Sequence, residues 1–160
     1  MRFPEETSMK RLHPGLWIAL VTATVTTSAM SATTPDYRRS PSTRAAGLPF
    51  SDSVAAAGLV FLNSQIGNRP GEGRVVDGGL EPELGQALRN VDAALADRGL
   101  TRADIVMCTI VLRELADWPK LNRLWAASFP ADRLPARNVI GATPPLGGAV
   151  AVSCIAAAPR

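Results

Sequence analysis

An unbroken, largely apolar run over residues 105–112 constrains the fold more than any other stretch of this 160-residue chain. Its length and its β-branched residues favour a strand over a helix. A strand this apolar is stable where both faces of its sheet are covered. The helices of one chain of this size can cover one face only. We therefore expect the other face to pack on a second copy of the chain.

Two amphipathic helices are predicted, one on either side of this strand. The first spans about residues 82–98, with Pro82 in a first helical turn and Gly99 in position for a left-handed C-cap. The second follows Asp117, a plausible N-cap, and ends before Pro130. We interpret its apolar stripe as core, with no stacking role for its tryptophans. The stripe consists of Trp118, Leu121, Leu124, Trp125 and Phe129.

The remaining segments predict strands at both ends of one domain. Short β-rich stretches at 54–57, 59–66 and 74–76 precede the first helix, with a polar turn at 68–73. Two further strands are expected within 134–156. The order β-β-β-α-β-α-β-β is that of an α+β domain, a single sheet with both helices packed on one face. We assign this domain to residues 48–160.

The first 47 residues have a different composition. Residues 1–32 have the basic, apolar and small-residue order of a secretory signal peptide, with a possible start at Met9. The alternatives are an uncleaved membrane anchor or a start site placed upstream of a cytosolic protein. With cleavage, we expect an exported, periplasmic protein without stable membrane insertion. Residues 33–47 carry Pro, Ser, Thr and Arg without apolar periodicity, which predicts a flexible tether.

Several classes of chemistry are disfavoured by the residues present. The single histidine, His13, lies in the predicted signal peptide, so the mature chain should have no histidine base and no histidine metal ligand. No phosphate loop or zinc spacing appears, and no basic stripe with interleaved aromatics suggests nucleic acid. Cys108 and Cys154 both fall in predicted strands. We favour two buried thiols, while a disulfide remains open for an exported protein.

One cation stands out near the end of the chain. Arg137 begins a run of small and apolar residues, so its charge should be partly desolvated and should need an anion. A guanidinium can hold a carboxylate through two parallel hydrogen bonds, which suits a small organic acid. The alternative is an internal salt bridge to an Asp or Glu of the protein, which spacing alone favours.

Two ordered motifs resemble those of a known family. The stretch Pro135-Ala136-Arg137, a strand, the turn Leu146-Gly147-Gly148 and a last strand ending in Cys154-Ile155-Ala156 are similar to the carboxy-terminal signature of the Rid family. These are the YjgF-type reactive-intermediate deaminases, also called L-PSP proteins. Residues 50–53 and 58–67 are similar to that family's opening hairpin. The resemblance implies a chorismate-mutase-like fold and a homotrimer around a central barrel.

The resemblance also implies an activity, which is hydrolysis of a reactive enamine or imine to a 2-oxo acid and ammonia. No cofactor or metal is implied, and a small-molecule carboxylate is the expected substrate. Arg137 would bind the substrate carboxylate in a pocket between adjacent subunits. Further residues would line that pocket, namely Phe50, Asn63, Ser64, Asn122 and Val139.

The last strand departs from the family pattern. Where active members commonly read Glu-x-Glu, this chain has Ala151 and Ser153. A serine hydroxyl is a poor base at neutral pH, so Ser153 would position a water by hydrogen bonding without taking its proton. The alternative function is therefore a non-catalytic trimer that binds a small carboxylate on the same scaffold. The ribonuclease activity attached to the L-PSP name gains no support, because the histidine and the basic groove it needs are missing.

Overall fold

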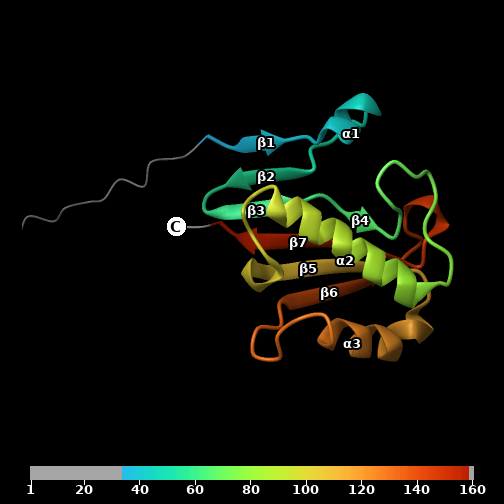
Figure 1. Cartoon of the computed structure of the whole chain (residues 1–160). Helices are drawn as coiled ribbons and strands as arrows, with labels where there is room; N and C mark the ends of the chain where they lie inside the picture. Colours follow the sequence, from blue (N-terminus) through green and yellow to red (C-terminus); the bar gives the residue numbers. More distant parts are fainter. Residues whose placement is uncertain (1–33, 159–160) are drawn as a thin grey trace, which may run out of the picture. The chain divides into compact units, whose positions relative to one another are not determined.

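A computed structural model describes residues 34–158, which form one mixed sheet with helices packed against it (Figure 1). The predicted signal peptide lies outside the described residues. The strands are β1 (Asp36–Arg38), β2 (Ser53–Ala56), β3 (Leu59–Leu62), β4 (Gln65–Ile66), β5 (Ile105–Leu112), β6 (Ala136–Gly141) and β7 (Val150–Ala157). The α-helices are α1 (Pro41–Ala45), α2 (Leu80–Ala96) and α3 (Trp118–Ala126). Three 3-10 turns are η1 (Arg102–Asp104), η2 (Leu115–Asp117) and η3 (Pro145–Gly147).

The sheet order is β1-β2-β3-β7-β5-β6, and β4 pairs with β7 beyond the end of β3. The β5–β6 pair is parallel, as a connection through α3 requires, and the other pairs are antiparallel. Figure 1 shows α2 lying across the sheet. Helix α3 lies beside β6, at the lower edge of the sheet in this view. This is the α+β, chorismate-mutase-like arrangement that was predicted.

Helix α2 supplies more of the core than any other single element. Its apolar stripe of Leu84, Leu88, Val91 and Leu95 is buried with the inward side chains of β5 and β7. Each such side chain contributes about 1.5–3 kcal/mol on burial. The chain leaves the helix through Gly99, whose φ of 70° lies in the left-handed region that favours glycine. The predicted first helix, residues 82–98, thus differs from the observed α2 by two residues at each end.

Strand β5 is covered on one face only within the described residues. Cys108, Ile110 and Leu112 are fully buried beneath the helices, whereas Met107, Thr109 and Val111 on the other face are half-buried. The alternation follows from the pleat, which sends successive side chains to opposite faces. We call this second, uncovered side the open face of the sheet. Its covering by another copy of the chain stays a prediction.

The predicted tether is corrected by the structure over residues 36–45. Strand β1 pairs with β2, and α1 follows it. Polar bonds hold this segment, since the Asp52 carboxylate accepts from the Ser40 backbone N–H and from the Thr43 hydroxyl. Arg98, at the end of α2, donates to Asp36 and Ser53. Apolar periodicity in a sequence does not indicate a segment that is ordered by polar contacts.

Two further predictions are wrong. The expected strand at 74–76 is a single bridge between Asn68 and Val75. The preference for two buried thiols also fails, because Cys108 and Cys154 form a disulfide between β5 and β7. They lie directly opposite each other in the antiparallel ladder, with a Cα–Cα distance of 4.1 Å. The register of β5 against β7 depends on the tertiary structure and cannot be predicted from the sequence alone.

Candidate functional site

Arg137 lies on β6, at the edge of the described sheet, and its side chain packs against α3. It is in register with the buried Cys108, which places it on the helix-covered face. Its Nη2 donates to Oδ1 of Asn122, and its Cζ lies 5.6 Å from the centroid of the Trp125 ring. Partial burial lowers the pKa of Arg137 below its ordinary value. The group remains protonated at neutral pH.

The surroundings of Arg137 test the internal salt bridge that its sequence context allowed. Within residues 34–158, no Asp or Glu oxygen forms a salt bridge with its guanidinium. A neutral amide and an aromatic face orient the group without cancelling its charge. The internal salt bridge is therefore not formed in the described part of the chain. Arg137 is left as an oriented cation suited to an anionic ligand.

Of the predicted site residues, Asn122 and Val139 lie nearest to this arginine in the fold. Asn122 is on α3 and fixes the guanidinium directly. Val139 follows two residues after Arg137 on the same face of β6, where it packs against the core. The structure thus brings together the strand and helix contributions that the sequence assigned to one pocket.

Phe50, Asn63 and Ser64 lie elsewhere in the described chain. Phe50 precedes β2 and is exposed, and the backbone N–H of Asn63 donates to the Asp52 carbonyl at the end of β3. Strands β7 and β5 stand between β3 and β6. Three spacings of about 4.8 Å put these residues on the order of 14 Å from Arg137. One chain alone therefore does not bring them onto a ligand held by this arginine.

Ser153 lies on the opposite side of the sheet from Arg137. It pairs with Thr109, one position from the buried Cys108–Cys154 pair, and so faces the open side. There it contributes to a shallow hollow of about 220 Å³ together with Phe61, Met107 and Ile155. Within a single chain, the Ser153 hydroxyl cannot hold a water against a ligand bound at Arg137.

Two functional contacts were missed from the sequence. Trp125 is core, as predicted, with 4% of its surface exposed, but it also stacks beneath Arg137, a role that had been set aside. Its spacing of three residues from Asn122 was the available signal, because residues three apart share a helix face. Glu83 of α2 is buried and accepts a 2.6 Å bond from the Ala149 backbone N–H, which fixes the turn before β7.

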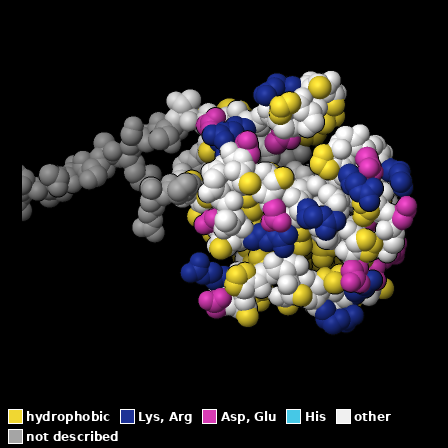
Figure 2. All heavy atoms as spheres, in the orientation of Figure 1, with side chains coloured by type: hydrophobic (Ala, Val, Ile, Leu, Met, Phe, Trp, Pro, Cys, Tyr) yellow, Lys and Arg dark blue, Asp and Glu magenta, His cyan; other side chains and the backbone are white. Residues whose placement is uncertain are grey.

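No group of three or more His, Cys, Asp or Glu side chains in 34–158 is arranged to hold a metal ion. None of the helices in that range is long and apolar enough to cross a membrane. On the side drawn in Figure 2, Lys and Arg alternate with Asp and Glu over the surface and form no single basic stripe.

Comparison with known proteins places the chain. The family model described as endoribonuclease L-PSP matches residues 41–158, which is most of the sequence. The chain belongs to the L-PSP family, the Rid or YjgF-type proteins. The match includes α1, β2 and every later element of the described fold.

Relatives and solved structures of this family resemble the chain over comparable lengths. It is 35% identical to Reactive Intermediate Deaminase A, chloroplastic, of Arabidopsis thaliana over 68% of its own length and 58% of that protein's. It is 30% identical to the 2-iminobutanoate/2-iminopropanoate deaminase of Bos taurus, over 68% of this chain and 79% of that one. The crystal structure of the Rid protein YyfA from Yersinia pestis superposes with a TM-score of 0.70 at 26% identity, covering 78% of this chain and 99% of that one.

Proposed function

We propose that this L-PSP family chain hydrolyses a small enamine or imine carboxylate to the 2-oxo acid and ammonia. The carrying observation is Arg137, a half-buried cation oriented by Asn122 and Trp125 and lacking a carboxylate partner among the described residues. The Arabidopsis and bovine relatives are named as deaminases of reactive or imino intermediates, which supports the same chemistry. In this proposal Arg137 binds the substrate carboxylate through paired hydrogen bonds.

The reaction requires few catalytic groups from the protein. A water oxygen adds to the C=N carbon while the nitrogen gains a proton, giving a tetrahedral carbinolamine. The C–N bond then breaks, the hydroxyl oxygen becomes the ketone, and ammonia leaves with the transferred proton. The imine is already electrophilic, so holding it by its carboxylate and keeping one water in line can accelerate the reaction without a cofactor.

The proposed pocket lies between subunits of a homotrimer. Two observations support it. The open face carries half-buried and exposed apolar side chains from several strands, and these need a cover. They include Phe61, Met107, Val111, Ile140 and Ile155. In addition, Phe50, Asn63 and Ser64 are too far from Arg137 to share a ligand within one chain, so a neighbouring copy is the natural source of these contacts.

A non-catalytic carboxylate-binding trimer is the second candidate. The observation that favours it is the missing acid. Ala151 and Ser153 occupy the last-strand positions where active relatives were expected to carry glutamate. A serine hydroxyl orients water but is a poor proton acceptor at neutral pH. Binding without turnover requires nothing more than the arginine clamp.

One experiment separates the candidates. An amino-acid oxidase generates the imine in situ, and release of 2-oxo acid is compared between the full chain, Arg137→Ala and the matched charge control Arg133→Gln. Arg133 is exposed and lies on the loop before β6. Turnover in the parent and the control that vanishes in Arg137→Ala supports the hydrolase. Binding of 2-oxobutanoate that Arg137→Ala alone loses, with no turnover in any variant, supports the binding protein.

We further propose that the chain is exported to an oxidising compartment such as the periplasm. The Cys108–Cys154 disulfide supports this placement, because disulfides persist there and are rare in the reducing cytosol. Both cysteines are almost completely buried, which fits a structural role. Alkylation of thiols in fractionated cells before and after reduction tests it. Free thiols on a chain recovered from the cytosolic fraction would contradict export.

A further inference from the structure

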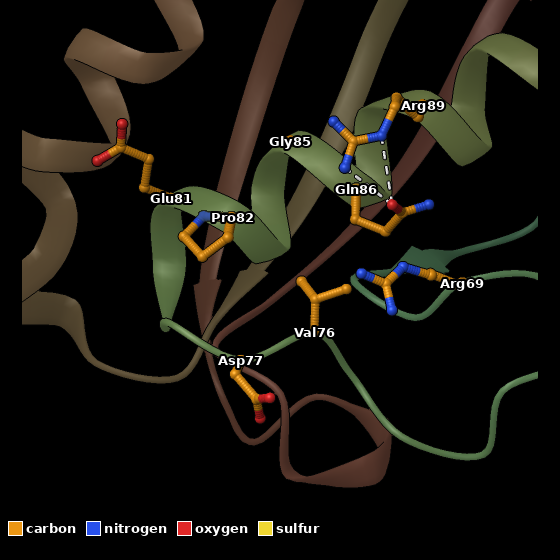
Figure 3. Close-up of a pocket in the computed structure, with 8 residues that line it drawn as sticks. All are labelled: Arg69, Val76, Asp77, Glu81, Pro82, Gly85, Gln86 and Arg89. Atoms are coloured by element: carbon orange, nitrogen blue, oxygen red, sulfur yellow. Dashed lines mark hydrogen bonds between the residues drawn. The ribbon is translucent and has the colours of Figure 1, made fainter.

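A second candidate anion site lies on α2, away from Arg137. A cavity of about 520 Å³ opens between the first half of this helix and the loop before it (Figure 3). Its size falls in the range of small-molecule sites. Its lining consists of Arg69, Val76, Asp77, Glu81, Pro82, Gly85, Gln86 and Arg89. None of these residues belongs to the site proposed above.

Arg89 is oriented by a chain of neutral hydrogen bonds. Its Nη2 and Nε donate to Oε1 of Gln86 at 2.8 Å and 3.2 Å. Gln86 is 7% exposed, and its amide donates to Oδ1 of Asn90 at 2.9 Å. Asn90 in turn donates to the backbone carbonyls of Ile66 and Asn68. The guanidinium is thus held in one orientation by groups that carry no charge.

No carboxylate in residues 34–158 forms an ion pair with Arg89, although Asp77 and Glu81 line the same pocket. The carboxylate of Asp77 pairs with Arg74 at 3.3 Å, and that of Glu81 pairs with Lys120 at 3.8 Å. Figure 3 shows both acid side chains directed away from the two arginines. Arg69 has only an exposed contact of 3.5 Å with Glu72, which contributes little.

Gly85 keeps the floor of this cavity open. It lies inside α2, where glycine costs roughly 1 kcal/mol relative to alanine. Close packing does not require it, since the sole atom that an added Cβ would meet within 4 Å is Nη1 of Arg89, at 3.6 Å. A helix-interior glycine that faces an open cavity and no neighbouring backbone leaves room for the guanidinium and for a ligand beside it.

We propose that this cavity binds a small phosphate-bearing anion. Two guanidinium groups line one space, and a phosphate offers three strong acceptor oxygens that can take paired hydrogen bonds from both at once. A single carboxylate can also contact two arginines, but its one negative charge balances only one of them, whereas a phosphate monoester carries a charge of about −1.5 to −2 at pH 7. The ligand is therefore a phosphate monoester or a diphosphate, distinct from the carboxylate bound at Arg137.

The test is calorimetric titration of the full chain with inorganic pyrophosphate. Arg89→Gln should weaken binding at least about tenfold, because it removes a charge-assisted pair of bonds. The matched control Arg44→Gln removes an exposed arginine from α1 and should leave the affinity unchanged. Arg137→Ala should also bind pyrophosphate normally while losing 2-oxobutanoate, so this proposal and the proposed function succeed or fail separately.

A second variant controls for binding that is lost because a variant misfolds. Gly85→Leu fills the cavity with a side chain of higher helix propensity, so its Tm should be equal to or above that of the parent. Loss of pyrophosphate binding in this well-folded variant supports the site. Equal affinity in the parent and Arg89→Gln, or no pyrophosphate binding by the parent chain, would overturn the proposal.

Discussion

At the scale of single residues, the arginines of the two candidate sites are held by neutral partners. Arg137 is fixed by an asparagine and a tryptophan ring, and Arg89 by a buried glutamine. The other approach, a carboxylate partner, is used where the role is structural, as in the paired bonds of Arg102 to Asp92 at 2.6 Å and 2.7 Å. A neutral partner fixes the geometry and leaves the charge for a ligand.

This contrast predicts losses of affinity of different size for two changes at Asn122. Asn122→Asp places a carboxylate against Arg137, which should form an internal salt bridge and lower the affinity for 2-oxobutanoate by about tenfold or more. Asn122→Ala removes the orienting bond and should cost less, about two- to fivefold. Calorimetric titration of both variants measures the difference. If the aspartate variant bound as well as the alanine variant, Arg137 would not be the carboxylate ligand.

A second residue-scale prediction concerns Asp52 and pH. Burial raises the pKa of this carboxyl, but hydrogen bonds from Ser40 and Thr43 outweigh burial, so the pKa in the folded chain lies below the ordinary value of 3.8. A folded-state pKa below the unfolded one stabilises the protein above the unfolded pKa, and this stabilisation is lost as pH falls through the folded pKa.

The parent should therefore be more stable than Asp52→Asn at pH 7 by about 1 kcal/mol, the typical net contribution of one hydrogen bond. The difference should shrink below about pH 4. Urea unfolding of both chains at pH 7 and at successively lower pH measures it. A difference that stayed constant, or grew, on acidification would contradict the role given to the ionised carboxylate.

At the scale of elements, the disulfide joins two central strands of the sheet directly beneath the helices. Its half-cystines are 46 residues apart in sequence, so oxidation closes a long loop in the unfolded chain. Replacing both cysteines by alanine should cost about 2–4 kcal/mol of unfolding free energy. Guanidinium unfolding of the oxidised parent, the reduced parent and the double variant measures this cost. Equal stability of all three would show that the bridge does not form in solution.

Elements with strong periodicity could be predicted from sequence, and those held by polar contacts could not. Helix α2 was located to within two residues because four leucine and valine side chains mark one face. Strand β1 and helix α1 were missed because Asp36, Asp52 and Arg98 hold them through side-chain bonds. At the candidate site, motif resemblance identified Arg137 and Asn122. Trp125 was missed as a stacking partner, since that contact depends on how α3 packs beside β6.

At the scale of the whole molecule, the two faces of the sheet differ. One is sealed by α2 and α3, and the other exposes apolar side chains between polar ones in residues 34–158. Isolated apolar residues are common on monomers, but a contiguous set on adjacent strands marks an interaction surface. Because the predicted pocket residues are also divided between the ends of the sheet, ligand binding at Arg137, which lies on the helix-covered face, should depend on the assembly made through the open face.

Thr109→Arg tests that dependence. The side chain lies half-buried in the middle of the open face beside Ser153, so a charge there should block subunit packing without disturbing the core on the opposite face. Light scattering should report a trimer for the parent and a folded monomer for the variant, and the monomer should release no 2-oxo acid although its Arg137 is intact. Ala93→Glu, a charge placed on the exposed side of α2, should remain trimeric and as active as the parent. A parent that is monomeric, or a monomeric variant with full turnover, would show that one chain suffices and that the separation of Arg137 from Asn63 and Ser64 has another explanation.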